Sequence, residues 1–232
     1  MQKTIIRFLL PIFASRNKTL QTHTKKTFKL LTAFAIALIT TISTTACTKI
    51  PVQQSDGFTK VSLSRETEYG NDWIYFSFAE GKELTGIDES NRGDNLKWDI
   101  AFNRYNFRTN SGLSGKGQGG VLDTGETDLN LIPAVPEGEF EVDEMGEIIK
   151  SMSSMPPPKM KTPLNKLLGK AIKMKMQMPP VYVPNNHVYI IRTADGKYAK
   201  IKVLGFYNEE EESGYVTFEY EYQPDGSLTF NK

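Results

Sequence analysis

"HVYIIRTADGKYAKIKVLGFYNEEEESGYVTFEYEY", residues 187–222, is the stretch that decides the fold class. Its first part holds two runs of β-branched and aromatic residues on either side of Asp195-Gly196, a dipeptide suited to the positive φ angles of a tight two-residue turn. Its last part, "VTFEYEY", places apolar and polar residues alternately, as a half-buried strand does. The stretch therefore predicts consecutive antiparallel strands, with the acidic run at 208–214 as a solvated turn.

Strand signals continue outward from this stretch, while helical signals are few. The segments "DWIYFSFAE" (72–80) and "LKWDIAFNRYNFRTN" (96–110) are rich in aromatic and β-branched residues. The best helical candidate is "TPLNKLLGKAI" (162–172), whose threonine can cap a helix, whose proline suits a first turn and whose leucines share one side. We predict an all-β protein with a single antiparallel β-rich domain over residues 58–232 and at most one short helix.

The N-terminal region has the features of an export signal. Residues 1–46 contain seven basic residues and no acidic residue, and they end in an apolar run that stops at the sole cysteine, Cys47. A basic segment, a short apolar segment and small residues before a cleavage point are typical of signal peptides. The sequence therefore predicts a lipoprotein signal peptide over 1–46, a lipid on Cys47 and a polar tether over 47–57.

Composition excludes several classes of function. Beyond residue 46 the chain has 21 basic residues (28 less the seven of the leader) against 27 acidic ones, a poor basis for binding nucleic acid. Cys47 alone offers no disulfide framework and no thiolate metal site. His187 is the only histidine left, and we expect it to make a structural hydrogen bond. The glycine-rich segment at 111–120 lacks phosphate-loop spacing and predicts a turn or bulge. No arrangement of residues supports an enzyme.

The methionines are the unusual feature of the sequence. Seven of the eight lie between residues 145 and 178, in two clusters beside prolines. If "KMKMQM" (173–178) is extended, its three methionines point to one face. Thioethers can pack a core, and as soft donors they also suit Cu(I) or haem iron. From the residues alone, core packing, copper binding and haem binding all remain open.

Three segments resemble the HmuY family of haem-binding lipoproteins. They are "WDIAFNRYNFRTNSGLSGKGQGGVLDTGETDL" (98–129), "NNHVYIIRTADGKYAKI" (185–201) and "GYVTFEYEY" (214–222). The resemblance implies an all-β fold whose extended loops grip one haem b per chain. It also implies a hemophore-like carrier, which takes haem from host or bacterial haem proteins and passes it to a TonB-dependent receptor. The expected location is the outer membrane, at the cell surface rather than the periplasmic face, with a released form as a further option.

This sequence departs from the family's founding member, which ligates haem iron with two histidines. The corresponding positions fall near residues 159–160 and 175–176, where no histidine stands. We therefore expect methionines to bind the haem, the candidates being Met155, Met160, Met174, Met176 and Met178. Met176 is the favoured iron ligand from the second cluster, paired with Met155 or Met160 from the first. Met152 and Met145 rank behind, and Met145 is expected at a core position in a strand.

Two other functions stay open on the sequence. A Cu(I)-binding lipoprotein would use the same thioethers as soft donors. A structural or adhesive surface lipoprotein would use them only for packing. Methionine ligation has a distinct consequence, because thioether donors raise the reduction potential of haem iron relative to histidine. It therefore predicts tighter binding of ferrous than of ferric haem.

Overall fold

The computed structural model describes residues 53–55, 57–64, 72–151 and 153–230. These residues belong to one compact unit, Cys47–Lys232. The predicted signal peptide, the predicted lipidation site at Cys47 and the candidate Met152 lie outside the described residues. Within the described ranges, no helix is long and apolar enough to cross a membrane.

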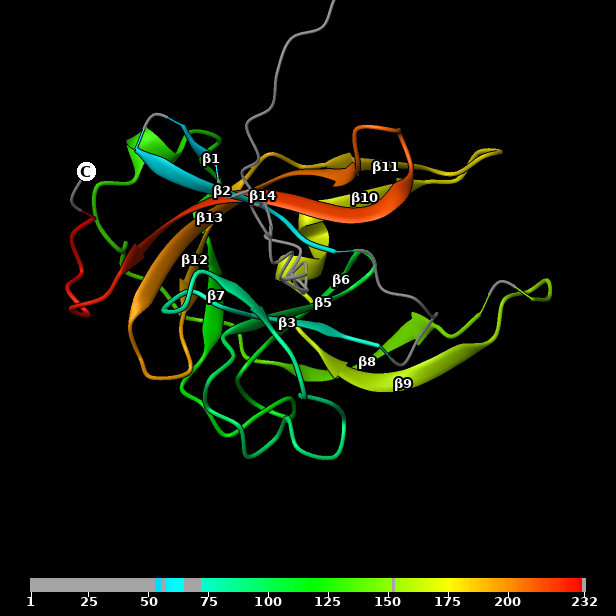
Figure 1. The fold of residues 1–232 in the computed structure, drawn as a ribbon, viewed down its shortest axis with the longest axis horizontal. Coiled ribbons are helices and arrows are strands. Elements are labelled where there is room, and N and C mark those ends of the chain that lie inside the picture. The colour runs from blue at the N-terminus through cyan, green and yellow to red at the C-terminus, as the bar shows by residue number, and fades with distance from the viewer. Residues whose placement is uncertain (1–52, 56, 65–71, 152, 231–232) are drawn as a thin grey trace, which may run out of the picture. The chain divides into compact units, whose positions relative to one another are not determined.

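The larger sheet has six strands in the order β1-β2-β14-β13-β12-β7, with antiparallel neighbours throughout (Figure 1). The strands are β1 (Gln53–Ser55), β2 (Phe58–Ser62), β7 (Gly120–Asp123), β12 (Val188–Arg192), β13 (Tyr198–Tyr207) and β14 (Ser213–Gln223). The last three come from the stretch that decides the fold class, and the all-β prediction is confirmed. β1 lies within the stretch predicted to be a tether, so the sheet begins before residue 58.

The hairpin of β12 and β13 has a different turn from the one predicted. The Thr193 amide donates to the Lys197 carbonyl at 2.8 Å, and the Gly196 amide donates to the Thr193 carbonyl at 3.0 Å. Of the predicted Asp195-Gly196 pair, only Gly196 has a positive φ, at 84°. A type I′ two-residue turn on Asp195-Gly196 would need positive φ angles at both residues, so the chain instead uses a three-residue loop that ends on a left-handed glycine.

A second sheet of four strands, in the order β4-β3-β5-β6, packs against the first. Its strands are β3 (Ile74–Ser77), β4 (Lys82–Leu84), β5 (Ile100–Asn103) and β6 (Asn106–Thr109). Phe76 and Phe102 on this sheet meet Phe218 of β14, with ring centroids 5.3 and 5.7 Å apart. Phe218 belongs to the alternating face predicted for β14, and that face forms the core between the sheets.

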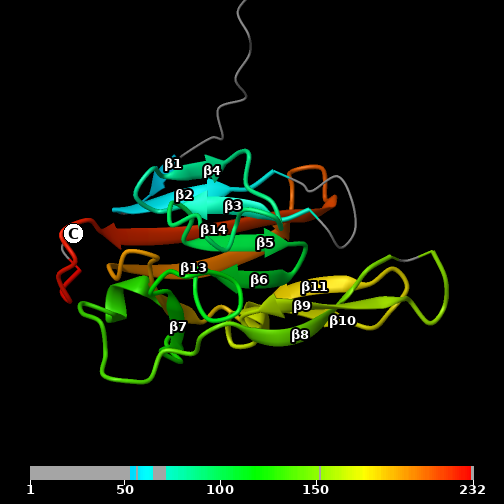
Figure 2. The same ribbon diagram turned by 90° about the horizontal axis from the view of Figure 1, so that it is seen from below.

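Two hairpins extend from the same end of the domain (Figures 1 and 2). The first arm comprises β8 (Glu144–Ile149), β9 (Lys159–Leu164) and their loop, and the second arm comprises β10 (Ile172–Lys175), β11 (Val181–Pro184) and their loop. A short 3-10 helix, η2 (Leu168–Ala171), connects them, and the only other helical segment among the described residues is η1 (Leu129–Leu131).

The helix predicted over 162–172 is wrong in its first half. Thr162 and Leu164 lie in β9, opposite Gly146 and Glu144 of β8, so neither caps nor lines a helix. Pairing with β8 satisfies the backbone along the strand and buries Leu164 to 9% exposure. The leucine spacing that favours a helix is realised only in the single turn of η2.

Candidate functional site

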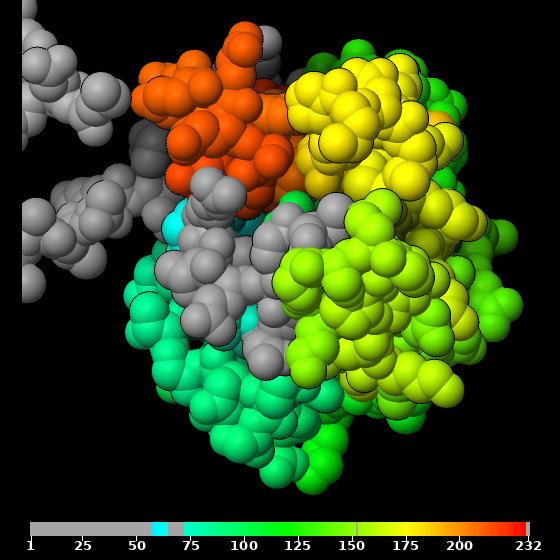
Figure 3. All heavy atoms as spheres, turned by 90° about the vertical axis from the view of Figure 1, so that its right-hand side faces the viewer, coloured from blue at the N-terminus to red at the C-terminus, as the bar shows by residue number. Residues whose placement is uncertain are grey.

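The two arms bring both methionine clusters to one end of the domain. Residues 150–151 and 153–158 belong to the loop of the first arm and include Met155, while residues 176–180 form the loop of the second arm. Figure 3 looks onto both loops: the yellow surface of the second arm lies above the yellow-green surface of the first. Segments that are separate in the sequence therefore share one face of the molecule.

A cavity of about 510 Å³ lies between these loops and the turn that joins β5 to β6. Its size is within the range of small-molecule and cofactor sites, which is roughly 300–1,000 Å³. Its walls are mostly apolar, with four methionines, two tyrosines, an isoleucine and two prolines. The lining residues that carry the argument are Met155, Met174, Met176, Met178, Tyr105, Tyr182 and Arg104.

Three of the cavity methionines are exposed to solvent. Met155 is 81% exposed, Met176 85% and Met178 96%, so these side chains are not packing a core. Exposing three large apolar side chains on one face is unfavourable unless a ligand or partner covers them. Met174 differs, because it is half-buried and packs against the main core while still lining the cavity.

The three methionines of "KMKMQM" do not lie on one face of a single strand, as they would if residues 173–178 were all extended. β10 ends at Lys175, so only Met174 lies in the strand, and Met176 and Met178 belong to the following loop. Two prolines, Pro179 and Pro180, stop the strand because they donate no backbone hydrogen bond to a ladder. The curved loop nevertheless directs all three side chains to the same cavity.

The remaining methionines lie elsewhere. Met160 is half-buried in β9, where it packs against the cluster that contains Trp73 and Trp98, and it does not line the cavity. Met145 lies in β8 as expected, but it is 48% exposed, so the predicted core position is wrong. The inward side of β8 is instead taken by Ile148, which is 3% exposed.

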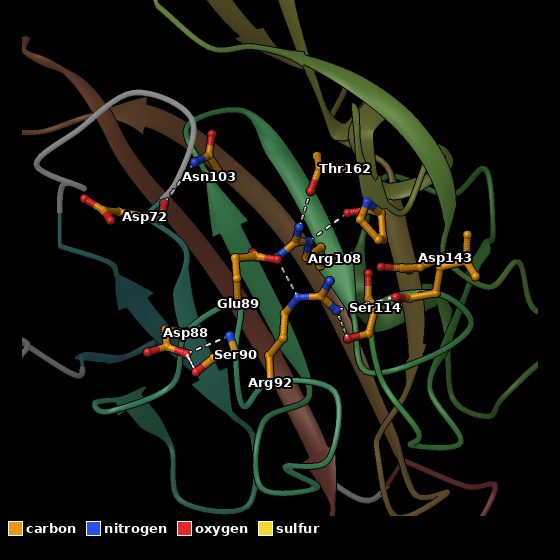
Figure 4. A network of polar contacts seen from close by, with 12 residues as sticks. Asp72, Asp88, Glu89, Ser90, Arg92, Asn103, Arg108, Ser114, Asp143 and Thr162 are labelled. Carbon is orange, nitrogen blue, oxygen red and sulfur yellow. Dashed lines mark hydrogen bonds and ion pairs between the residues drawn. The ribbon is translucent and has the colours of Figure 1, made fainter. Parts of the chain in front are cut away.

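A buried arginine fixes the first arm to the four-stranded sheet. The side chain of Arg108, on β6, is fully buried, and its Nε donates to the Pro163 carbonyl of β9 at 2.7 Å. The same guanidinium bonds to the Thr162 hydroxyl and pairs with Glu89 (Figure 4). It also lies over the Trp73 ring, 3.8 Å from the centroid. Burial lowers the pKa of Arg108, although Glu89 opposes that effect.

A second polar cluster holds the foot of the first arm. Asp143, just before β8, accepts bonds from the Thr109 amide at 3.0 Å and hydroxyl at 2.6 Å. Asn165, just after β9, donates to the same carboxylate at 3.1 Å and accepts from the Leu168 amide at 2.9 Å. Burial raises the pKa of Asp143. Both ends of the arm are therefore tied to one buried carboxylate.

Other sequence features have structural roles. His187 lies just before β12, and its Nδ1 is 3.0 Å from an Asp123 oxygen, as expected of a structural histidine. The glycine-rich segment wraps around the Asn110 side chain: a Cβ at Gly115 would lie 2.0 Å from its Oδ1. The Gly117 amide donates to that same oxygen at 3.1 Å. Among the described residues, no group of three histidine, cysteine or acidic side chains is placed to hold a metal ion.

Arg104 is a site residue that the sequence did not indicate. It lies in the β5–β6 turn, far in sequence from the methionines, and it is the only charged residue among the described residues that line the cavity. Only its positive φ of 55° marks it as unusual, and that angle is not visible in the sequence. The arrangement thus offers several thioethers, an apolar enclosure and one cation.

Known proteins resemble the chain in sequence and in fold. The family model for HmuY protein matches residues 69–220. A candidate HmuY-like haem-binding protein from Bacteroides vulgatus is 27% identical with a TM-score of 0.59, over 74% of this chain and 95% of that one. A candidate lipoprotein from Bacteroides fragilis is 26% identical with a TM-score of 0.56, over 74% and 92%.

A third structure supports the fold alone. An apo HmuY analogue from Tannerella forsythia is 24% identical with a TM-score of 0.57, over 75% of this chain and 99% of that one. No curated protein matches the chain closely enough to count as a relative.

Proposed function

Because the chain belongs to the HmuY protein family, we propose that it is a haem-binding carrier that holds one haem b between the loops of its two arms. The observation that carries the proposal is the cavity of about 510 Å³, with methionines from both loops in its wall. A planar apolar ligand suits a space bounded by two loops and two tyrosines. In the part of the chain that the structure describes, we identify no arrangement of side chains that supports catalysis, so we assign binding and transfer rather than an enzymatic reaction.

The lining residues fit haem in three respects. Thioethers are established axial ligands of haem iron. Met155 on the first loop and Met176 on the second are exposed side chains that line the same cavity, so we propose them as the iron ligands. Met174 and Met178 are the alternatives on the second loop, and Tyr105 and Tyr182 supply aromatic surface.

Met160 ranks below Met155 as the ligand from the first arm. It lies on β9 against the Trp73 cluster, and reaching the cavity would require it to leave that packing. Met155 needs no such change, because it already lines the cavity.

Methionine ligation determines which oxidation state is preferred. Thioether donors favour ferrous over ferric iron and raise the reduction potential relative to histidine ligands. The protein's own contribution is to enclose the ligand with apolar side chains, which exclude water and supply most of the affinity by burying its faces. We therefore expect tighter binding of reduced haem.

The same thioethers could hold Cu(I), which also prefers soft donors. A single ion needs only two or three sulfur atoms, however, and it would not contact the aromatic walls or the Arg104 side chain of this cavity. Haem accounts for all of these features, so we favour it. A purely structural or adhesive role leaves three exposed methionines unexplained.

An absorbance titration of the full chain with haem, with and without dithionite, tests the proposal. We expect a saturable one-to-one complex with sharp low-spin ferrous bands and weaker ferric binding. Met155→Leu and Met176→Leu keep apolar volume but remove a thioether, so each should change the spin state. Met145→Leu is the matched control, because Met145 is also exposed but does not line the cavity.

Several outcomes would contradict haem binding or ligation by two methionines. A spectrum identical to that of free haem in both oxidation states would exclude haem binding. Tighter ferric than ferrous binding would exclude a site with two methionine ligands. Stoichiometric Cu(I) binding that protects the methionines from oxidation, without haem binding, would favour the copper alternative.

The export and transfer steps are a further part of the proposal. We propose that the mature chain is anchored in the outer membrane by a lipid on Cys47, faces the cell surface, and passes haem from host or bacterial haem proteins to a TonB-dependent receptor. The basic, apolar and small-residue order of residues 1–46 supports the anchor. Cys47→Ser should abolish labelling by a lipid precursor and move the protein out of the membrane fraction; retained labelling would contradict the anchor.

A further inference from the structure

Arg104 brings a full positive charge to a cavity that is otherwise apolar. The other lining side chains of the described residues are methionine, isoleucine, proline and tyrosine, together with the neutral Gln177. The attraction of such a charge for an anion increases as water is excluded from the cavity. The planar guanidinium matches a carboxylate with two parallel hydrogen bonds.

The turn beneath Arg104 is held firmly. Asn103 and Asn106 pair across β5 and β6, so Arg104 and Tyr105 form the loop between them. The Asn106 side chain donates to the Asn103 carbonyl at 3.0 Å and closes the turn. Tyr105 packs on Tyr182 of the second arm, with ring centroids 5.3 Å apart. The base of the Arg104 side chain is therefore fixed relative to the cavity wall.

The backbone at this position does not favour arginine. Arg104 has a φ of 55°, in the left-handed region that is unfavourable for a side chain with a Cβ. Glycine, asparagine or aspartate would meet the needs of the turn at lower cost. Strained positions of this kind concentrate at ligand sites, where the side chain serves the ligand.

We propose that Arg104 binds a carboxylate at the edge of the ligand and thereby determines both its class and its orientation. The inference rests on the proposed function, in which the ligand is haem, and assigns the propionate edge of the tetrapyrrole to the β5–β6 turn. A guanidinium has five N–H donors, so Arg104 can keep a contact within the protein and still bind a carboxylate. Tetrapyrroles without free carboxylates should bind poorly.

The cations nearest the methionines in the sequence are two lysines, and we do not assign the carboxylate to them. Lys173 and Lys175 lie on β10, and both are exposed and outside the cavity lining. Charge removal at Lys175 is therefore a matched control for charge removal at Arg104.

The experiment compares two variants and three ligands on the full chain. Arg104→Gln and the control Lys175→Gln are titrated with ferrous haem, its dimethyl ester and metal-free protoporphyrin IX. We expect Arg104→Gln to weaken binding of haem and protoporphyrin by about 10- to 100-fold, the usual effect of losing a charge-assisted bond. Binding of the ester should be weak in the wild type and unchanged by Arg104→Gln. Arg104→Gly, which suits the positive φ, repeats the comparison if the glutamine variant folds poorly.

The outcomes separate this inference from the proposed function. If the wild type binds haem but Arg104→Gln and Arg104→Gly bind it equally well, Arg104 is not the anchor and the proposed function stands. If the variants lose the same affinity for haem and for the ester, Arg104 acts through packing and the inference is overturned. If the wild type binds no tetrapyrrole in either oxidation state, both fail.

Discussion

The two arms bring methionines to one cavity but are fixed to the domain by different forces. The first arm is held at its base by buried polar groups, with Arg108 and Asp143 as the centres of two hydrogen-bond clusters. The second arm is held mainly by apolar packing, since Ile172 and Tyr182 belong to the main core. The polar base fixes direction, because each bond has a required geometry, whereas the apolar base tolerates small shifts.

Loss of Arg108 should have the largest effect. Arg108→Ala leaves the Pro163 carbonyl and the Thr162 hydroxyl without their donor and opens a void beneath Trp73. We expect the free energy of unfolding to fall by about 3–5 kcal/mol, measured by urea denaturation. The control is Lys166→Ala, just after β9, whose exposed pair with Glu144 of the first arm should contribute little. Equal losses in the two variants would contradict a polar anchor.

Truncation of Tyr182 should be slightly less costly and should test the apolar base. Its ring centroid lies 4.6 Å from that of Phe206, 5.3 Å from that of Tyr105 and 6.3 Å from that of Tyr207, so Tyr182→Ala removes three aromatic contacts. We expect a loss of about 3 kcal/mol in the free energy of unfolding. Val181→Ala, next to it on β11 and only half-buried, serves as the control. A loss at Tyr182 no larger than at Val181 would show that packing does not hold the second arm.

The pH dependence of stability should distinguish the polar attachment of the first arm from the apolar attachment of the second. Burial raises the pKa of Asp143, whereas in the unfolded chain an aspartate ionises near pH 4. Above about pH 4 the folded protein therefore binds more protons than the unfolded one, and its stability falls as the pH rises through the folded pKa. Mild acidification should therefore increase the contribution of Asp143 to the free energy of unfolding, and Asp143→Asn should remove that contribution.

Urea denaturation between pH 4.5 and 8 measures this effect. Asp99, whose pKa burial raises to about 6, contributes a slope of the same sign in both proteins. The difference between wild type and Asp143→Asn therefore isolates Asp143. Parallel curves for the two proteins would contradict the assignment, even if the variant is less stable at every pH.

Local patterns predicted the sheets well and the ends of the elements less well. The alternation that ends at Tyr222 identified β14, because one face of that strand is buried against the second sheet. The leucines of residues 162–172 fit a helix, but cross-strand pairing of Leu164 with Glu144 decided otherwise. A contact between distant segments overrode a local propensity there, as tertiary context often does.

The sequence predicted that methionines would form the candidate site, but it did not predict which individual residues line the cavity. Clustering of methionines indicated the two loops, and Met155, Met174, Met176 and Met178 do line one cavity. Arg104 and the Arg108–Thr162 contact join segments 50 or more residues apart, so no local pattern could reveal them. The spacing of the first methionine cluster also could not show that Met160 of β9 packs against the Trp73 cluster, because the side that a strand residue faces depends on strand register.

That last point gives the smallest and most specific prediction, a comparison of Met155 with Met160 on the first arm. Met160 packs against the Trp73 cluster, so Met160→Leu should change the free energy of unfolding by about 1 kcal/mol or less and leave the ferrous haem spectrum unchanged. Met155 is 81% exposed, so Met155→Leu should leave stability unchanged but alter the spectrum. The two readouts should therefore separate. A spectral change in Met160→Leu alone would mean that the first arm shifts along its register on binding, which the polar base should prevent.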